Sequence, residues 1–352
     1  MTSITIHASR PYDVLIAPGA LDRVGELLRP LVKTDRAALI CGDIVHPLYG
    51  GRARRALERA GFRVCVKVIP HGEVHKNLST YAGILSFLGE NEFGRDDPIV
   101  ALGGGVTGDI AGFAAASWQR GCPLVQIPTT LLAAVDASVG GKTAIDLPGG
   151  KNQAGFFYQP LAVFCDPELF STLPPRELRC GLAEVVKTGV LFDRELFDSL
   201  RGGCDPARAG ELVARCVEHK RVLVERDEFD RGERQLLNLG HSFGHAIERR
   251  SDYALSHGEA VAIGLSMIAR AAAKRGLCAA QTAEKIVSLL RTLGLPTDCP
   301  FPAEELLEPL RRDKKRGADT LRLVVPHEIG RCELTEVPLS ELGSWLRDGG
   351  AP

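Results

Sequence analysis

Three of the nine histidines fall within one short stretch of the chain, at His241, His245 and His257. His241 and His245 are four residues apart, so on a helix they would lie on one face. A zinc-protease motif would need glutamate at position 242, where this chain has Ser242. A catalytic metal site has three protein ligands and an open position, and Glu184, in an otherwise apolar helical stretch, could join His241 and His257. An ordinary ion pair of Glu184 with a nearby lysine, and a core position for His245, are the alternatives.

Glycines with the spacing G-x-G-x-x-G occur at 103–108, directly after an apolar stretch at 98–102. Between a strand and a helix, this spacing lets the backbone approach a pyrophosphate that faces the helix N-terminus. The acid that would bind the ribose, about 20 residues further on, is missing from 124–130. A dinucleotide would therefore need an upstream carboxylate, for which Asp43 and Glu73 follow expected strands. A tight strand–helix turn without a ligand is the alternative.

A second glycine-rich stretch contains Gly140-Gly-Lys-Thr143. A phosphate-binding P-loop would need glycine at position 136, where the chain has Asp136, so that motif is excluded. Lys142 and Lys151 each follow a glycine and are nine residues apart. They could close on an anion, or be solvated surface lysines.

The elements that must position these residues change in character near residues 170–175. Before that point short apolar strands alternate with helices, which predicts a mostly parallel, doubly wound sheet. Strands are expected at 4–7, 13–16, 37–41, 62–69, 98–102, 124–127 and 161–165, and helices at 20–29, 52–60, 78–88 and 108–116. After it, helical periodicity dominates at 176–191, 209–226, 239–249, 258–275 and 283–292, with one strand at 320–325. We predict an α/β Rossmann-like N-terminal domain, 1–172, and a mainly α-helical C-terminal domain, 173–352.

The composition is that of an ordinary globular protein, with 45% apolar and 25% charged residues among 352. The formal net charge of -1 gives no global field that would favour nucleic acid or an anionic membrane. No apolar run approaches the roughly 18–20 residues that span a bilayer, and no apolar leader is visible. The ten cysteines form no Cys-x-x-Cys pair. We expect a cytoplasmic protein with reduced thiols that binds neither nucleic acid nor membrane.

Motifs spread over nearly the whole chain closely resemble those of the 3-dehydroquinate synthase family. In chain order they are Gly72-Glu73-x-x-Lys76, Gly103-Gly-Gly-Val-Thr-Gly-Asp-Ile-Ala-Gly-Phe113, Arg120, Gln126-Ile-Pro-Thr-Thr130, Val135-Asp-Ala-Ser-Val-Gly-Gly-Lys-Thr143, Gly150-Lys-Asn152, Leu173-Pro-Pro-Arg-Glu177, Gly181-Leu-Ala-Glu-Val-Val-Lys187, Leu237-Asn-Leu-Gly-His-Ser-Phe-Gly-His245, His257-Gly-Glu259 and Arg312-Asp-Lys-Lys315.

The resemblance implies a homodimer with its active site in an interdomain cleft, tightly bound NAD, and Zn or Co held by Glu184, His241 and His257. It implies a cofactor-binding set of Asp43, Glu73, Lys76, Gly105, Val106, Thr107, Gly108, Asp109, Thr129, Thr130, Asp136, Lys142, Lys151 and Thr172. It also implies that Lys142, Asn152, one lysine of the pair Lys314 and Lys315, and Arg120 of the partner subunit hold the substrate phosphate. Arg234 would bind the carboxylate, and Lys187, Lys220, Asn238 and His245 would orient hydroxyls and relay protons.

The implied reaction converts 3-deoxy-D-arabino-heptulosonate 7-phosphate, a phosphorylated sugar acid, to 3-dehydroquinate and phosphate in the shikimate pathway. Its steps are transient oxidation by NAD, phosphate β-elimination, reduction, ring opening and intramolecular aldol closure. A related sugar-phosphate cyclase is one alternative, which Lys142 and Arg234 disfavour. A metal-dependent polyol dehydrogenase, which would release NADH, is another. A non-catalytic NAD-binding regulator is the third, although clustered cations and metal ligands are costly without a ligand.

Overall fold

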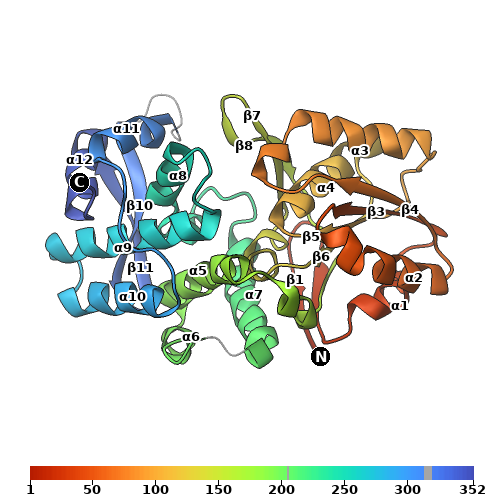
Figure 1. Ribbon diagram of the computed structural model, residues 1–352, viewed down its shortest axis with the longest axis horizontal. Helices are drawn as coiled ribbons and strands as arrows, with labels where there is room; N and C mark the ends of the chain where they lie inside the picture. The colour runs from red at the N-terminus through yellow and green to blue at the C-terminus, as the bar shows by residue number, and fades with distance from the viewer. Residues whose placement is uncertain (204–205, 313–318) are drawn as a thin grey trace. The chain divides into compact units, whose positions relative to one another are not determined.

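The computed structural model describes residues 1–203, 206–312 and 319–352 (Figure 1). The chain forms two compact units. The first contains Met1–Leu173 and Pro206–Phe229, and the second contains Pro174–Asp205 and Asp230–Pro352. The segment 206–229 therefore packs with the first unit, although the predicted boundary between residues 172 and 173 assigns it to the second domain.

The first unit is built on a seven-stranded sheet in the order β1-β2-β9-β6-β5-β3-β4. The strands are β1 (Thr2–Ile6), β2 (Tyr12–Ile16), β3 (Arg36–Gly42), β4 (Arg63–Ile69), β5 (Ile99–Gly103), β6 (Leu124–Pro128) and β9 (Ala162–Cys165). β1 pairs antiparallel with β2, and every other neighbouring pair is parallel. The prediction of a mostly parallel α/β sheet is confirmed.

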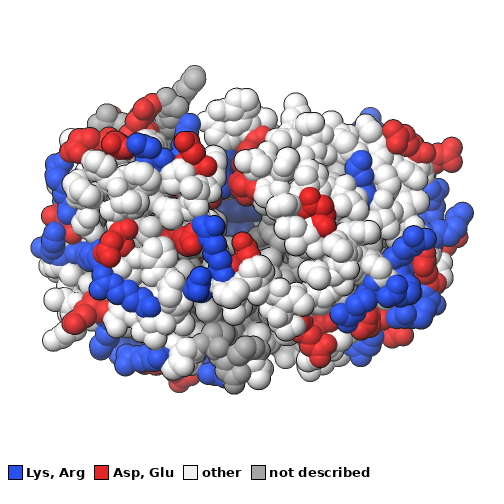
Figure 2. Space-filling view, in the orientation of Figure 1, with Lys and Arg blue, Asp and Glu red and all other residues white. Residues whose placement is uncertain are grey.

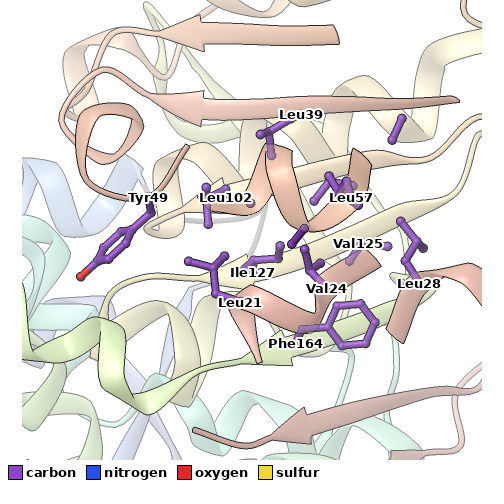
Figure 3. Packing of buried hydrophobic residues seen from close by; sticks show 14 of the residues in the cluster. Leu21, Val24, Leu28, Leu39, Tyr49, Leu57, Leu102, Val125, Ile127 and Phe164 are labelled. Carbon is purple, nitrogen blue, oxygen red and sulfur yellow. The ribbon is translucent and has the colours of Figure 1, made fainter. Parts of the chain in front are cut away.

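Helices cover both faces of this sheet. They are α1 (Val24–Leu28), α2 (Gly51–Arg59), α3 (Leu78–Glu90) and α4 (Gly105–Ser117), and α7 (Ala209–Arg226) packs on β1 and β2. Because side chains alternate along a strand, Leu39 joins a core cluster with α1 and α2, while Ile40 joins another with α3 and α4. Figure 3 shows Leu21, Val24 and Leu57 of the first cluster against the strands. Burial on both faces explains why these strands read as continuous apolar runs.

A separate two-stranded hairpin, β7 (Lys142–Leu147) and β8 (Gly150–Phe157), also belongs to the first unit. It carries Lys142 and Lys151, the lysines of the two glycine–lysine pairs. Its residues are largely exposed or half-buried, so no apolar alternation predicted it.

The second unit is mainly helical, as predicted. It contains α5 (Pro175–Phe192), α6 (Arg194–Ser199), α8 (His241–Arg250), α9 (His257–Lys274), α10 (Ala280–Thr292), α11 (Ala303–Arg312) and α12 (Leu342–Asp348), with a hairpin of β10 (Thr320–Glu328) and β11 (Arg331–Pro338). α9 is the central helix, contacts α5, α8, α10 and α12, and is buried throughout 260–269. Among the described residues, no helix combines the length and apolarity that crossing a bilayer requires.

Candidate active site

Glu184, His241 and His257 come together inside the second unit. Glu184 lies in the middle of α5, and the two histidines are the first residues of α8 and α9. Glu184 Oε1 is 3.5 Å from Nε2 of His241 and 3.5 Å from Nε2 of His257. One ligand atom from each of the three residues lies within 4.8 Å of the others. The arrangement offers one carboxylate and two imidazoles to a single cation.

Both imidazoles direct Nε2 toward Oε1 of Glu184. Nδ1 of His241 is 3.1 Å from the carbonyl oxygen of Leu239, and Nδ1 of His257 is 3.5 Å from Oε2 of Glu248. A histidine that donates its Nδ1–H to an acceptor keeps Nε2 as a ligand atom. Glu248 was not among the residues that the sequence singled out. In the sequence, Glu248 is marked only by its position seven residues after His241, which places both on the same helix face.

Glycines set the close helix contacts that bring Glu184, His241 and His257 together. A Cβ on Gly258 would lie 2.4 Å from Cα of Cys180, so α9 can begin against α5 only with glycine there. A Cβ on Gly264 would lie 2.1 Å from the carbonyl oxygen of Gly240, which fixes the contact between α8 and α9. The glycine next to His257 therefore serves packing, and through packing it sets the position of the histidine.

The start of α9 is also anchored by polar groups. Ser256 and Glu259 form a capping box, in which each side chain bonds to the backbone N–H of the other. Arg176 of α5 donates from Nε and Nη2 to the two carboxylate oxygens of Glu259, at 2.9 and 2.6 Å. Arg176 also donates to the carbonyl oxygen of Ala254. These bonds tie the first turn of α9, which carries His257, to the helix that carries Glu184.

The electrostatics of the cluster suit a cation. Lys187 Nζ lies 2.5 Å from Oε2 of Glu184, so the carboxylate meets the lysine with one oxygen and the imidazoles with the other. The ion pair that the sequence offered as an alternative thus coexists with the metal-type arrangement. Burial lowers the pKa of His241 to about 3, and Lys187 adds to that shift. Burial also lowers the pKa of His257, but hydrogen bonds with Glu184 and Glu248 outweigh it and raise that pKa to about 10.

Three further predicted residues belong to the same unit. His245 lies beside the cluster, with its ring centroid 5.3 Å from that of His241 and 5.9 Å from that of His257. Arg234 is 1% exposed, and Asn238 ends the same short helical segment, Glu233–Asn238. Lys314 and Lys315 lie outside the described residues.

In the first unit, the glycine-rich turn joins β5 to α4. Gly104 is the N-cap residue of α4 and has no side chain that could accept a hydrogen bond. The first backbone N–H groups of α4 are therefore not capped by a side chain. A Cβ on Gly108 would lie 2.7 Å from Oε1 of Gln126 on β6, and the Gln126 amide donates to the carbonyl oxygen of Gly108. Gly108 therefore lets α4 pack closely on the sheet, in addition to any role toward a ligand.

Predicted cofactor residues surround the start of α4. Lys76 Nζ lies 2.5 Å from Oδ2 of Asp109 and 2.5 Å from Oδ1 of Asn152. Burial lowers the pKa of Lys76, but the carboxylates of Asp109 and Glu73 outweigh it and raise that pKa. Lys151 Nζ lies 2.9 Å from Oε1 of Glu73. Asn152, predicted for the substrate phosphate, thus lies among residues predicted for NAD.

The remaining predicted residues of the first unit are more spread out. Lys220 of α7 donates to the carbonyl oxygen of Asp136 at 2.7 Å and pairs with its carboxylate. The Thr172 hydroxyl is 2.6 Å from that of Tyr49. Asp43, Lys142 and Arg120 are exposed, Thr129 is buried, and Thr130, Gly105 and Val106 are half-buried, while Thr107 is buried against Gly103.

The outer surface of α2 carries several arginines, some of them paired with acids. Arg52 lies 2.7 Å from Asp22, and Arg54 lies 2.7 Å from Glu58. Figure 2 shows blue and red side chains mixed on this face. The mixture of signs fits a solvated surface better than a phosphate-backbone footprint.

Solved structures share this architecture over nearly the full chain. A 2-deoxy-scyllo-inosose synthase complexed with carbaglucose-6-phosphate, NAD+ and Co2+ matches with a TM-score of 0.89 and 27% identity, covering 99% of this chain and 100% of that one. A 2-epi-5-epi-valiolone synthase from Streptomyces hygroscopicus subsp. jinggangensis 5008, with NAD+ and Zn2+ bound, matches with a TM-score of 0.88 and 28% identity over 96% of both chains. The fold is therefore that of the sugar-phosphate cyclases, a class of enzymes.

Sequence comparison identifies the family within this class of enzymes. Family models described as 3-dehydroquinate synthase N-terminal and C-terminal match residues 66–180 and 181–316. A 3-dehydroquinate synthase of Xanthomonas oryzae pv. oryzae (strain PXO99A) is 45% identical over 348 residues, 94% of each chain. The chain belongs to the 3-dehydroquinate synthase family, as its motifs predicted.

Proposed function

We propose that this enzyme converts 3-deoxy-D-arabino-heptulosonate 7-phosphate to 3-dehydroquinate and phosphate, as a phosphorus–oxygen lyase of the shikimate pathway. The observation that carries the proposal is the convergence of Glu184, His241 and His257, in a chain 45% identical to a 3-dehydroquinate synthase. The proposed steps are transient oxidation, phosphate β-elimination, reduction, ring opening and intramolecular aldol closure, with no net redox change. We propose a cytoplasmic homodimer.

The three ligand residues fit a zinc or cobalt ion. Two imidazole nitrogens and one carboxylate oxygen form the donor set of open catalytic sites, which leave a position for substrate. Lys187 holds the second oxygen of Glu184 and so orients the carboxylate toward the imidazoles. When bound, such a metal lowers the pKa of a coordinated hydroxyl, and NAD accepts and returns a hydride.

The first unit offers a fitting site for NAD. The backbone N–H groups at the start of α4 lack a side-chain cap and suit a pyrophosphate. Asp43 and Glu73 follow β3 and β4 of the parallel sheet and could accept ribose hydroxyls, in place of the acid missing after β6. We propose the whole predicted set as cofactor-binding, from Asp43 to Thr172, with Asp136 and Lys151 near the nicotinamide.

The substrate carries a phosphate and a carboxylate, and each needs cationic partners. We propose that Arg234 binds the carboxylate, since a buried guanidinium offers a rigid fork of donors for it. Lys142 and Asn152, with Lys314 or Lys315, would hold the phosphate. Lys187, Lys220, Asn238 and His245 would orient hydroxyls and hold protons.

Arg120 is proposed to reach the phosphate bound by the other subunit of the dimer. Its backbone supports a special role: Gln119 has φ 47°, Arg120 φ 67° and Gly121 φ 119°, three successive residues in the left-handed region. Non-glycine residues rarely adopt that conformation, and such strain concentrates at functional sites.

A phosphate-release assay with the seven-carbon substrate tests the proposal. We expect release that depends on both NAD and the metal, with no net NADH. Stoichiometric NADH would indicate a polyol dehydrogenase instead. Turnover of a neutral hexose phosphate at the same rate would indicate a different sugar-phosphate cyclase, and no turnover with metal and NAD bound would indicate a binding protein.

A further inference from the structure

Glu248 is a buried carboxylate on the far side of one proposed metal ligand. It is 3% exposed and lies near the end of α8. Its Oε2 is 3.5 Å from Nδ1 of His257, whose Nε2 is 3.5 Å from Oε1 of Glu184. The imidazole of His257 is therefore held between two carboxylates, one on each ring nitrogen.

The two proposed histidine ligands differ in the acceptor that lies against Nδ1 of each ring. His241 has the neutral carbonyl oxygen of Leu239 against its Nδ1, while His257 has the charged carboxylate of Glu248. Burying a carboxylate is costly unless polar partners compensate it, and the His257 ring is one such partner. A carboxylate that accepts from the outer nitrogen of a ligating histidine fixes the ring and makes it a stronger ligand.

The helix contacts explain how Glu248 reaches this position. Glu248 follows His241 by seven residues, so both project from the same face of α8. That face packs on α9, where Gly264 and Gly240 allow the backbones to approach closely. One helix thus supplies a ligand directly through His241 and holds a second ligand, His257, through Glu248.

We propose that Glu248 is a positioning residue for the metal site. It accepts the Nδ1–H of His257, leaves Nε2 as the nitrogen that faces the cation, and adds a negative charge that the cation favours. This inference rests on the proposed function, because it assumes that Glu184, His241 and His257 hold a metal.

The test is a titration of metal-free protein with Co2+ alone, following metal affinity and the visible absorption of the bound ion. Glu248→Ala removes the acceptor, and we expect the affinity to fall roughly 10–100-fold. Glu248→Gln keeps the size and one acceptor oxygen, so it should lose less and rescue part of the Glu248→Ala defect. Glu248→Ala should shift the absorption bands, since the ring of His257 is freed to turn, and Glu248→Gln should shift them less.

Ser251→Ala is the matched control, because the Ser251 hydroxyl donates to the backbone carbonyl of Glu248 and not to its carboxylate. It should keep the affinity and spectrum of the unaltered protein. Wild-type affinity and bands in both Glu248 variants would overturn the positioning role and leave the proposed function standing. Failure of the folded, unaltered protein to bind Co2+ would instead overturn the metal site itself, and this inference with it. Thermal unfolding without metal confirms that each variant is folded.

Discussion

Replacing Gly258 by alanine should damage the proposed metal site without changing any of its proposed ligands. The added Cβ would lie 2.4 Å from Cα and 2.5 Å from the carbonyl oxygen of Cys180, both backbone atoms of α5. Ordinary carbon contacts begin near 3.4 Å, so α9 and α5 must separate by about 1 Å at this point (3.4 minus 2.4). Gly258 is next to His257 on α9, and Glu184 is one turn beyond Cys180 on α5, so the shift falls on the ligand distances.

The added methyl group should affect folding stability and metal affinity to different extents. Overpacking of this kind destabilises a protein by about 1–3 kcal/mol, which leaves most folds intact. Metal–ligand distances tolerate only about 0.2 Å, so a displacement several times larger should remove most of the metal affinity. We therefore expect folded Gly258→Ala protein with a moderately lower melting temperature, little bound metal and little phosphate release.

The measurements are metal content after dialysis, thermal unfolding and phosphate release. Gly83→Ala is the matched control, because a Cβ at Gly83, within α3, meets nothing within 4 Å. It should keep its metal and activity and gain up to about 1 kcal/mol, since alanine favours a helix more than glycine. Gly258→Ala protein with full metal content and activity would refute the packing argument.

Three further changes test the site. Glu184→Gln should abolish metal binding and cost about 3–5 kcal/mol of folding stability, since it leaves Lys187 buried without its carboxylate; full metal content after dialysis would contradict this. Arg234→Ala should weaken substrate binding by about 2–3 kcal/mol, from the loss of a charged bidentate contact; an equal loss for an analogue lacking the carboxylate would count against that role. Mixed dimers of inactive Arg120→Ala and His257→Ala subunits should regain some phosphate release, and proven mixed dimers without it would argue against shared sites.

Much of the fold followed from the sequence because its strands are buried on both faces. Runs such as 37–41 and 98–102 lie within or close to β3 and β5 as predicted. The hairpin of β7 and β8 was missed, since its exposed residues carry no apolar alternation. The helix at 209–226 was predicted, but its packing partner was not, because periodicity marks an apolar face without saying what covers it.

The candidate site, like the fold, could be predicted from the sequence only in part. Helical spacing placed His241 and His245 on one face, but residues far apart in sequence meet only through helix packing, which spacing cannot show. The ion pair of Glu184 does not exclude a metal, because a carboxylate has two oxygens and both contacts are made. Glu248 was not predicted as a site residue because its position beside Arg249 and Arg250 is typical of a solvated charge at a helix end.

His241 and His257 are each the first residue of a helix, and this has an electrostatic consequence. The amino end of a helix carries a partial positive charge, and side chains there lean back toward it. Two such ends disfavour a dication by about 0.3–1 kcal/mol each, an effect that the carboxylates of Glu184 and Glu248 oppose, and they favour an anion by a similar amount. The two helix ends would therefore add a small bias toward the deprotonated form of a substrate hydroxyl held at these residues, so the peptide backbone itself would assist deprotonation.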